Sequence, residues 1–197
     1  MASTDGCPDK IGPVAVMDPD QLSPSRPLTI IGLGNELLSD DGLGIRVVRS
    51  LRARLRDDRV AFEELSVGGL QLLDYVVGCR QCIIVDAIIT GSHPPGTLYR
   101  FVQKADRDLV RLTSSHQIDL SQVLALAKLM GADLPEKLTV YGIEAEDVIT
   151  FRDGCTDHVA RAIPRLVDVI CLDVEECIAA PSATAGEWQI IHEAGAT

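Results

Sequence analysis

The fold of this chain is decided by an apolar run that passes into a glycine-rich, acidic loop. The stretch reads Leu28-Thr29-Ile30-Ile31-Gly32-Leu33-Gly34-Asn35-Glu36-Leu37-Leu38-Ser39-Asp40-Asp41-Gly42-Leu43-Gly44. Residues Leu28–Gly34 form an almost continuous apolar run, which is typical of a parallel strand buried inside a sheet. Residues Gly42–Arg56 then place Val47, Val48, Leu51 and Leu55 on one face, as an amphipathic helix does. The stretch therefore predicts a strand followed by a helix.

The same alternation continues along the rest of the chain. Further strands are predicted at Val60–Val67, Cys82–Ile88, Gly96–Val102 and Leu138–Ile143, and helices at Gly69–Val77, at residues 118–130 and along the stripe from Val159 to Ile170. The alternating strand Gly96–Val102 fits an antiparallel strand at the sheet edge. Pro164 lies inside the last helix and predicts a bend there. Alternating strands and helices predict an α/β fold with a mostly parallel, twisted sheet and helices on both faces.

Length and composition narrow the functional classes. The 197 residues fit one domain, and a hydrophobic content of 46% is enough for a proper core. The formal net charge of −11 argues against nucleic acid or an anionic membrane surface as a partner, because both attract Lys and Arg. We find no membrane span and no signal peptide, so we expect a cytoplasmic protein whose six cysteines are reduced thiols.

The two ends of the chain differ in composition from the middle. Residues 1–27 hold five of the ten prolines, which predicts a flexible N-terminal extension. Residues 179–197 are rich in small residues and are predicted to form a C-terminal tail. A single α/β domain is expected to span residues 28–174.

A dinucleotide-binding loop is the first alternative for the glycine-rich segment. Gly32 and Gly34 fit its glycine spacing, but Leu37 occupies the third glycine position. Asp40 and Asp41 lie where the helix begins, and their charges would repel a pyrophosphate. The spacing therefore disfavours a nucleotide site.

Three polar residues at predicted strand ends suggest a metal site instead. Asp41 follows the first strand, Asp86 ends the third, and His116 lies in a loop before the helix at residues 118–130. Ligands of such sheets bind at the carboxyl ends of the strands, where two carboxylates and an imidazole would form an open site for Ni²⁺ or Zn²⁺. The alternative for Asp40 and Asp41 is a helix-capping role, with Ser39 as the N-cap residue.

Several motifs together resemble one family. They are Gly32-x-Gly34-Asn35-x-x-Leu38-x-Asp40-Asp41-Gly42-x-Gly44, Gly68-Gly69-Leu70-Gln71-Leu72-Leu73, Val85-Asp86-Ala87, Ser115-His116-Gln117 and Gly142-Ile143-Glu144. In order and spacing they resemble the hydrogenase maturation proteases, over residues 28–174. The resemblance implies a three-layer α/β/α sandwich. It also implies an endopeptidase that trims the C-terminus of a nickel-iron hydrogenase large-subunit precursor.

The resemblance also implies the roles of the three residues. Asp41, Asp86 and His116 match the family's metal-binding positions, and the metal is nickel that the precursor already carries. The expected activity is that of an aspartyl-type endopeptidase that acts as an enzyme activator. A carboxylate or a metal-bound water would assist hydrolysis, with Asp86 as the general base if only one of the two acids binds the metal. Residues 1–27, the tail and Ala145, where members often have proline, depart from the family pattern.

Other functions remain open at this point. A non-catalytic nickel-binding assembly factor would use the same three residues, and a nucleotide-binding oxidoreductase domain is the less favoured alternative.

Cys155, with Asp157 and His158 close behind it, could suggest a thiol protease, but such groups are assembled in space rather than in sequence. Cys79 and Cys82 form a lone CxxC, which we interpret as two buried small residues entering a strand.

Overall fold

A computed structural model describes residues 28–66, 70–104, 120–179 and 189–191. Its strands are β1 (Leu28–Leu33), β2 (Val60–Leu65), β3 (Gln81–Ile88), β4 (Leu98–Lys104), β5 (Lys137–Glu144) and β6 (Gln189–Ile190). Its helices are η2 (Ser39–Gly42), α1 (Leu43–Arg54), η3 (Leu70–Leu72), α2 (Leu73–Val76), α3 (Leu120–Leu129) and α4 (Asp157–Ala179). The predicted strands and helices are thus confirmed within the described residues, with ends that differ by a few positions.

These strands form one mixed sheet in the order β2-β1-β3-β5-β4-β6. The pairs β2–β1, β1–β3 and β3–β5 are parallel, and β4 runs antiparallel to both β5 and β6. The antiparallel orientation of Gly96–Val102 is confirmed. The prediction that this strand lies at the sheet edge was wrong, because β6 pairs with the outer side of β4.

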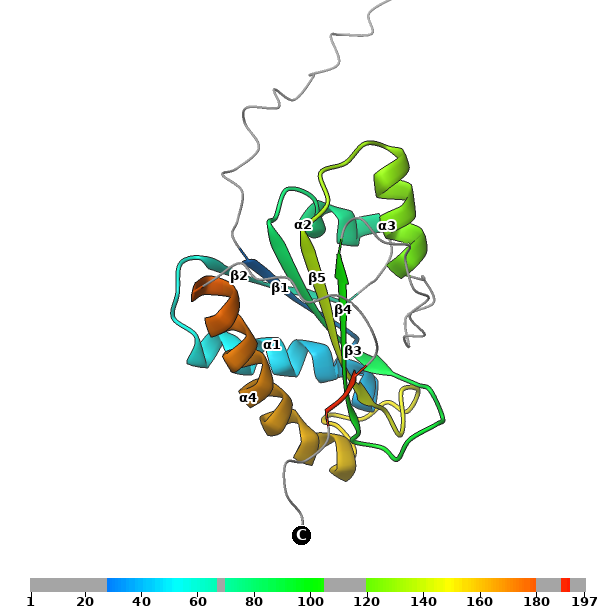
Figure 1. Ribbon diagram of the computed structural model, residues 1–197. Helices are drawn as coiled ribbons and strands as arrows, with labels where there is room; N and C mark the ends of the chain where they lie inside the picture. Colours follow the sequence, from blue (N-terminus) through cyan, green and yellow to red (C-terminus); the bar gives the residue numbers. More distant parts are fainter. Residues whose placement is uncertain (1–27, 67–69, 105–119, 180–188, 192–197) are drawn as a thin grey trace, which may run out of the picture.

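Helices cover both faces of the sheet, which confirms the three-layer α/β/α sandwich (Figure 1). One core joins α1 and α4 to one face, through buried residues such as Val47, Val48 and Leu166. A second core joins η3, α2 and α3 to the other face, through Leu72, Val76 and Leu124. Period-2 alternation in β3 separates the two cores, because Ile83 and Val85 belong to the first and Cys82 and Ile84 to the second.

Helix α4 runs without interruption from Asp157 to Ala179 and contains Pro164. The helix predicted through this proline is therefore confirmed.

None of the helices in the described part of the chain is long and apolar enough to cross a membrane.

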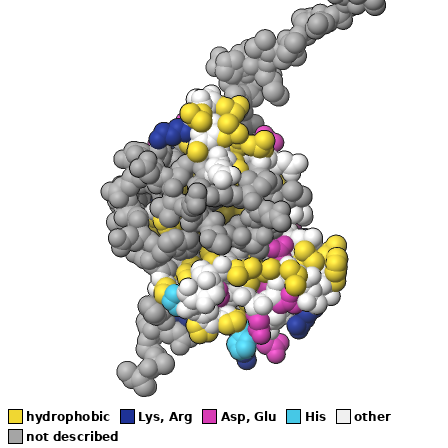
Figure 2. Space-filling model, turned by 90° about the vertical axis from the view of Figure 1, so that its right-hand side faces the viewer, with side chains coloured by type: hydrophobic (Ala, Val, Ile, Leu, Met, Phe, Trp, Pro, Cys, Tyr) yellow, Lys and Arg dark blue, Asp and Glu magenta, His cyan; other side chains and the backbone are white. Residues whose placement is uncertain are grey.

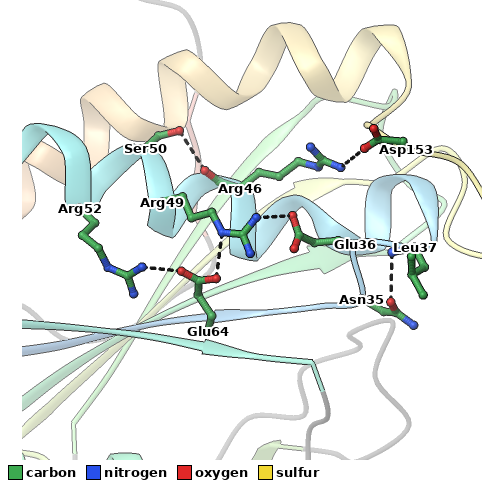
Figure 3. Close-up of polar contacts among 9 residues, drawn as sticks. All are labelled: Asn35, Glu36, Leu37, Arg46, Arg49, Ser50, Arg52, Glu64 and Asp153. Carbon is green, nitrogen blue, oxygen red and sulfur yellow. Dashed lines mark hydrogen bonds and ion pairs between the residues drawn. The ribbon is translucent and has the colours of Figure 1, made fainter.

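The polar face of α1 is occupied by ion pairs within the chain (Figure 3). Arg49 contacts Glu36 at 2.7 Å and Glu64 at 2.9 Å, Arg52 contacts Glu64 at 2.6 Å, and Arg46 contacts Asp153 at 3.1 Å. These pairs tie α1 to β2 and to the loops that follow β1 and β5. They therefore brace the carboxyl edge of the sheet.

Candidate active site at the carboxyl edge of the sheet

Asp41 and Asp86 come from neighbouring parts of the sheet. Strands β1 and β3 are paired, with Gly32 opposite Val85, so Asp86 follows directly after the last paired position. Asp41 lies in η2, which begins six residues after β1 and contacts β3. Both carboxylates therefore lie at the carboxyl edge, where ligands of parallel α/β sheets bind.

Asp41 is buried and is anchored to the loop after β1. Its side chain is 5% exposed, and its Oδ2 accepts a hydrogen bond from the Asn35 backbone N–H at 2.9 Å. Gly34 makes this close approach possible. Its φ is +142°, and a Cβ atom there would lie 1.9 Å from the Asp41 carbonyl oxygen. The glycine thus serves the packing of the acidic turn against the end of β1.

Asp86 is also buried, at 3% exposure. Its Oδ1 accepts a hydrogen bond from the backbone N–H of Ala87 at 2.8 Å. Buried carboxylates are costly unless they are hydrogen-bonded or bind a cation. Two of them on contacting elements can hold a divalent cation or can serve as a general base.

His116, the third predicted site residue, lies outside the described residues. Within the described ranges, no three His, Cys, Asp or Glu side chains form a group able to hold a metal ion. The described part of the site is therefore the pair Asp41 and Asp86.

Asp40 has a structural role, which corrects the capping interpretation. Neither η2 nor α1 has a side-chain cap, and Ser39, with φ +39°, is buried without a partner for its hydroxyl among the described residues. Asp40 is fully buried and its carboxylate accepts four hydrogen bonds instead. They come from the backbone N–H groups of Glu146 (2.9 Å), Asp147 (2.9 Å) and Thr156 (2.7 Å) and from the Thr156 hydroxyl (3.0 Å). Asp40 therefore fastens the loop between β5 and α4 to the turn that carries Asp41.

Sequence reasoning missed a second carboxylate network, around Glu144 at the end of β5. Glu144 is 2% exposed and accepts hydrogen bonds from the backbone N–H groups of Thr90 (2.9 Å) and Gly91 (2.8 Å) and from the hydroxyls of Thr90 (2.8 Å) and Tyr99 (2.6 Å). Glu144 thus holds the loop that follows β3 against β4 and β5. The available signal was an acidic residue ending an apolar strand, the same pattern that singled out Asp86.

The surroundings of Glu144 shift two pKa values. Burial alone would raise the pKa of Glu144, but the hydrogen bonds from Tyr99 and from the Thr90 loop outweigh it, so the pKa lies below 4.5. Burial, followed by the hydrogen bond to Glu144, raises the pKa of Tyr99 from 10.0 to about 12. Both shifts indicate that Glu144 is ionised and Tyr99 protonated near neutral pH.

The structure gives Gly44 a packing role and disfavours a catalytic thiol. Gly44 allows α1 to pack against two strands, since a Cβ there would lie 2.2 Å from the Leu33 carbonyl oxygen and 2.4 Å from that of Val85. The glycine thus serves helix packing.

Burial raises the pKa of Cys155 to about 11, whereas a catalytic thiol needs a lowered pKa. Cys79 and Cys82 are buried, and the five cysteines of the described residues form no disulfide.

Comparisons with known proteins place this chain and its fold in a family. The model of the hydrogenase maturation protease family matches residues 45–173, a range that includes Asp86 and His116 and begins four residues after Asp41. The hydrogenase 2 maturation protease of Escherichia coli K12 is 31% identical over 126 residues, which cover 61% of this chain and 74% of the relative. The hydrogenase expression/formation protein HupD of Rhizobium leguminosarum is 30% identical over 151 residues, which cover 74% and 72%.

A solved structure with a similar fold points to the same family. The hydrogenase maturating endopeptidase HybD from E. coli superposes with a TM-score of 0.65 at 27% identity, and the match covers 76% of this chain and 92% of HybD. The fold and its relatives thus define an α/β peptidase. The chain belongs to the hydrogenase maturation protease family and is an endopeptidase. These matches favour neither a non-catalytic assembly factor nor a nucleotide-binding oxidoreductase.

Proposed function

We propose that this endopeptidase removes the C-terminal extension of a nickel-iron hydrogenase large-subunit precursor after nickel has been inserted. Asp41, Asp86 and His116 bind the nickel, which the precursor carries as part of the substrate. The observation that supports this proposal best is the pair of buried carboxylates, Asp41 and Asp86, on two contacting elements at the carboxyl edge.

The chemistry of the donor set fits nickel. Imidazole nitrogen is a ligand that Ni²⁺ accepts readily, and carboxylate oxygens balance its charge. Three protein ligands leave coordination positions for groups that the precursor supplies. The enzyme would therefore bind a loaded precursor more tightly than an empty one, so nickel insertion would be a condition for cleavage.

The hydrolysis is of the aspartyl type. A carboxylate of the site, which is Asp86 when Asp41 is the only acid that binds the metal, accepts a proton from the attacking water, whose oxygen bonds to the carbon of the scissile carbonyl. The bond from this carbon to the peptide nitrogen then breaks, and the leaving amine takes up the proton. Cleavage completes the hydrogenase subunit, which makes the protease an activator of another enzyme. We place this reaction in the cytoplasm, where the free cysteines of the chain would remain reduced.

A mass measurement on the precursor tests this proposal. We expect a nickel-loaded precursor to lose a C-terminal peptide and a nickel-free precursor to stay intact. Equal cleavage of both forms would contradict the recognition of nickel.

Two variants test the assigned residues. Asp86→Asn should lower the cleavage rate by about 100-fold or more, because general-base catalysis alone contributes about that much. His116→Ala should also lower the rate strongly, because it removes the imidazole ligand of the nickel. Asp58→Asn, an exposed carboxylate before β2, is the matched control and should cleave normally. Circular dichroism shows whether each variant is folded. Normal cleavage by a folded Asp86→Asn or His116→Ala variant would overturn that residue's assignment.

A further inference from the structure

Three large apolar side chains are exposed on the two loops beside the candidate site. Leu37 is 65% exposed, Ile149 80% and Phe151 81%. Leu37 follows β1, and the other two lie between β5 and α4. We call these three residues the apolar rim. Figure 2 shows exposed hydrophobic side chains interspersed with acidic ones in the lower part of the molecule.

The two loops of the apolar rim are joined to each other. The Arg152 backbone N–H donates to the Leu37 carbonyl oxygen at 3.1 Å, and Leu38 forms a parallel bridge with Arg152. The Asp40 backbone N–H also donates to the Asp147 carbonyl oxygen at 2.9 Å. Leu37 and Phe151 therefore belong to one surface, although 114 positions separate them in the sequence.

Hydrogen bonds and ion pairs also fix the backbone of each loop. The Asn35 side chain accepts the Leu37 N–H at 3.1 Å, and Glu36 pairs with Arg49 (Figure 3). In the second loop, Asp147 Oδ1 accepts the N–H groups of Ile149 (3.1 Å) and Thr150 (3.0 Å). Because the backbone is held in this way, the apolar side chains are presented to solvent as a preformed surface. Exposed apolar side chains that are gathered on one surface and surrounded by polar residues mark protein contacts.

The position of the apolar rim indicates what it contacts. Leu37 lies four residues before Asp41, and the Asp41 carboxylate is bonded to the same loop through Asn35. A protein whose chain reaches Asp41 would therefore pass close to the apolar rim. The substrate of this endopeptidase is such a protein.

Charge argues against a second copy of this chain as the occupant. Residues 145–157 carry four acidic side chains and one arginine, within a chain of net charge −11. Two such surfaces would place like charges opposite each other, which opposes association. A partner that presents an apolar surface with basic side chains around it is complementary.

We propose that the apolar rim is the docking surface for the hydrogenase large-subunit precursor, with Phe151 inserting into an apolar recess of the precursor beside basic side chains. This proposal rests on the proposed function, because it takes the precursor as the substrate. It assigns binding of the folded precursor to Leu37, Ile149 and Phe151, apart from the groups that act on the peptide bond.

Steady-state kinetics on the precursor that the unaltered chain cleaves test the proposal. Phe151→Ser should raise KM by about tenfold or more, as the loss of an aromatic anchor does at protein interfaces, and should leave kcat within about twofold. Ile149→Ser is the second variant and should act in the same direction. Leu129→Ser is the matched control, because Leu129 is 86% exposed at the end of α3, on the chain leading to the amino end of β5 (Figure 1). It should leave both constants unchanged.

Failure of the docking surface can be told apart from failure of the proposed active site. Asp86→Asn tests the active site and should lower kcat, whereas Phe151→Ser tests docking and should change KM. A KM unchanged in both Phe151→Ser and Ile149→Ser would overturn the docking proposal and leave the active-site assignment intact. Light scattering provides a second test: if the unaltered chain is a dimer that Phe151→Ser converts to a monomer, the apolar rim contacts a second copy and the proposal is wrong.

Discussion

Asp40 and Thr156 lie 116 positions apart in the chain and are joined by two hydrogen bonds. The Thr156 backbone N–H donates to Asp40 Oδ1 at 2.7 Å, and its hydroxyl donates to Oδ2 at 3.0 Å. The adjacent Asp41 instead accepts a hydrogen bond from Asn35, on the loop after β1. Two neighbouring acids therefore have different partners: Asp40 joins the loop before α4 to η2, whereas Asp41 is bonded to the loop after β1.

Asp40→Asn should destabilise the protein. An amide group cannot accept hydrogen bonds at its nitrogen, so at least one N–H donor of the second loop would be left unpaired. We expect the free energy of unfolding to fall by about 2–4 kcal/mol, since a hydrogen bond to a charged group contributes about 1.5–3 kcal/mol. Urea denaturation measures this change. Thr156→Val removes only the hydroxyl bond and should cost less, so an equal or larger loss in that variant would contradict the assigned role of Asp40.

Asp41→Asn should abolish cleavage while changing the stability of the protein only slightly. The amide oxygen can still accept the hydrogen bond from the Asn35 backbone N–H, so the free energy of unfolding should change by less than about 1.5 kcal/mol. Cleavage of the nickel-loaded precursor should nevertheless be lost, because the charge that would bind the metal is gone. The precursor mass reports cleavage, and urea denaturation reports stability. A folded variant with normal cleavage would exclude Asp41 from the site.

Glu144→Gln should change the response of stability to acid. The pKa of Glu144 is lowered in the folded protein, so its contribution to stability is present above 4.5, its ordinary value, and is lost as the pH falls through the lower folded value. At pH 7 the variant should be less stable by about 1–3 kcal/mol. This difference should shrink below pH 4.5, as measured by thermal or urea unfolding at several pH values. A difference that is independent of pH would contradict the ionised state of Glu144.

Tyr99→Phe should remove a late step from the alkaline titration. The pKa of Tyr99 is raised from 10.0 to about 12, so the stability linked to its protonated form is present below pH 10 and is lost as the pH rises through about 12. Tyrosinate absorbance followed against pH should show a step near 12 that is absent from the variant. An identical titration curve for the two proteins would rule out the assignment of that step to Tyr99.

Gly44→Ala should weaken the docking of α1. The added Cβ would overlap the backbone oxygens of Leu33 and Val85, so the helix would have to move away from β1 and β3. Overpacking of this kind costs about 1–3 kcal/mol or more. Ser50→Ala is the control on the same helix. Ser50 is half-buried and its hydroxyl donates to the Arg46 carbonyl oxygen within α1 at 2.9 Å, so its loss should change stability by no more than about 0.5 kcal/mol. Similar midpoints of thermal unfolding for Gly44→Ala and the unaltered protein would show that the packing is looser than described.

The sequence predicted those features of the fold that depend on local periodicity. Strand β3 was recognisable because every residue from Cys82 to Ile88 except Asp86 is apolar, and α1 because its apolar residues recur at helical spacing. Helix α4 was recognisable despite Pro164, because the apolar stripe continues beyond it. Asp86 was singled out by its place at the end of a buried strand, and the same pattern would have pointed to Glu144.

Only the tertiary structure decided how these elements meet. The pairing of β1 with β3 brings Asp41 and Asp86 to one edge, and no local pattern determines which strands become neighbours. The role of Asp40 depends on partners more than 100 positions away, so its local sequence suggested a cap instead. Periodicity acts over a few residues, whereas hydrogen bonds between distant loops form only when the packed sheet brings those loops together. By itself, the sequence of this endopeptidase determined the elements and the acidic strand ends. The packing of the sheet decided which acids meet at the candidate site, which acid joins the loops, and which apolar side chains remain exposed beside them.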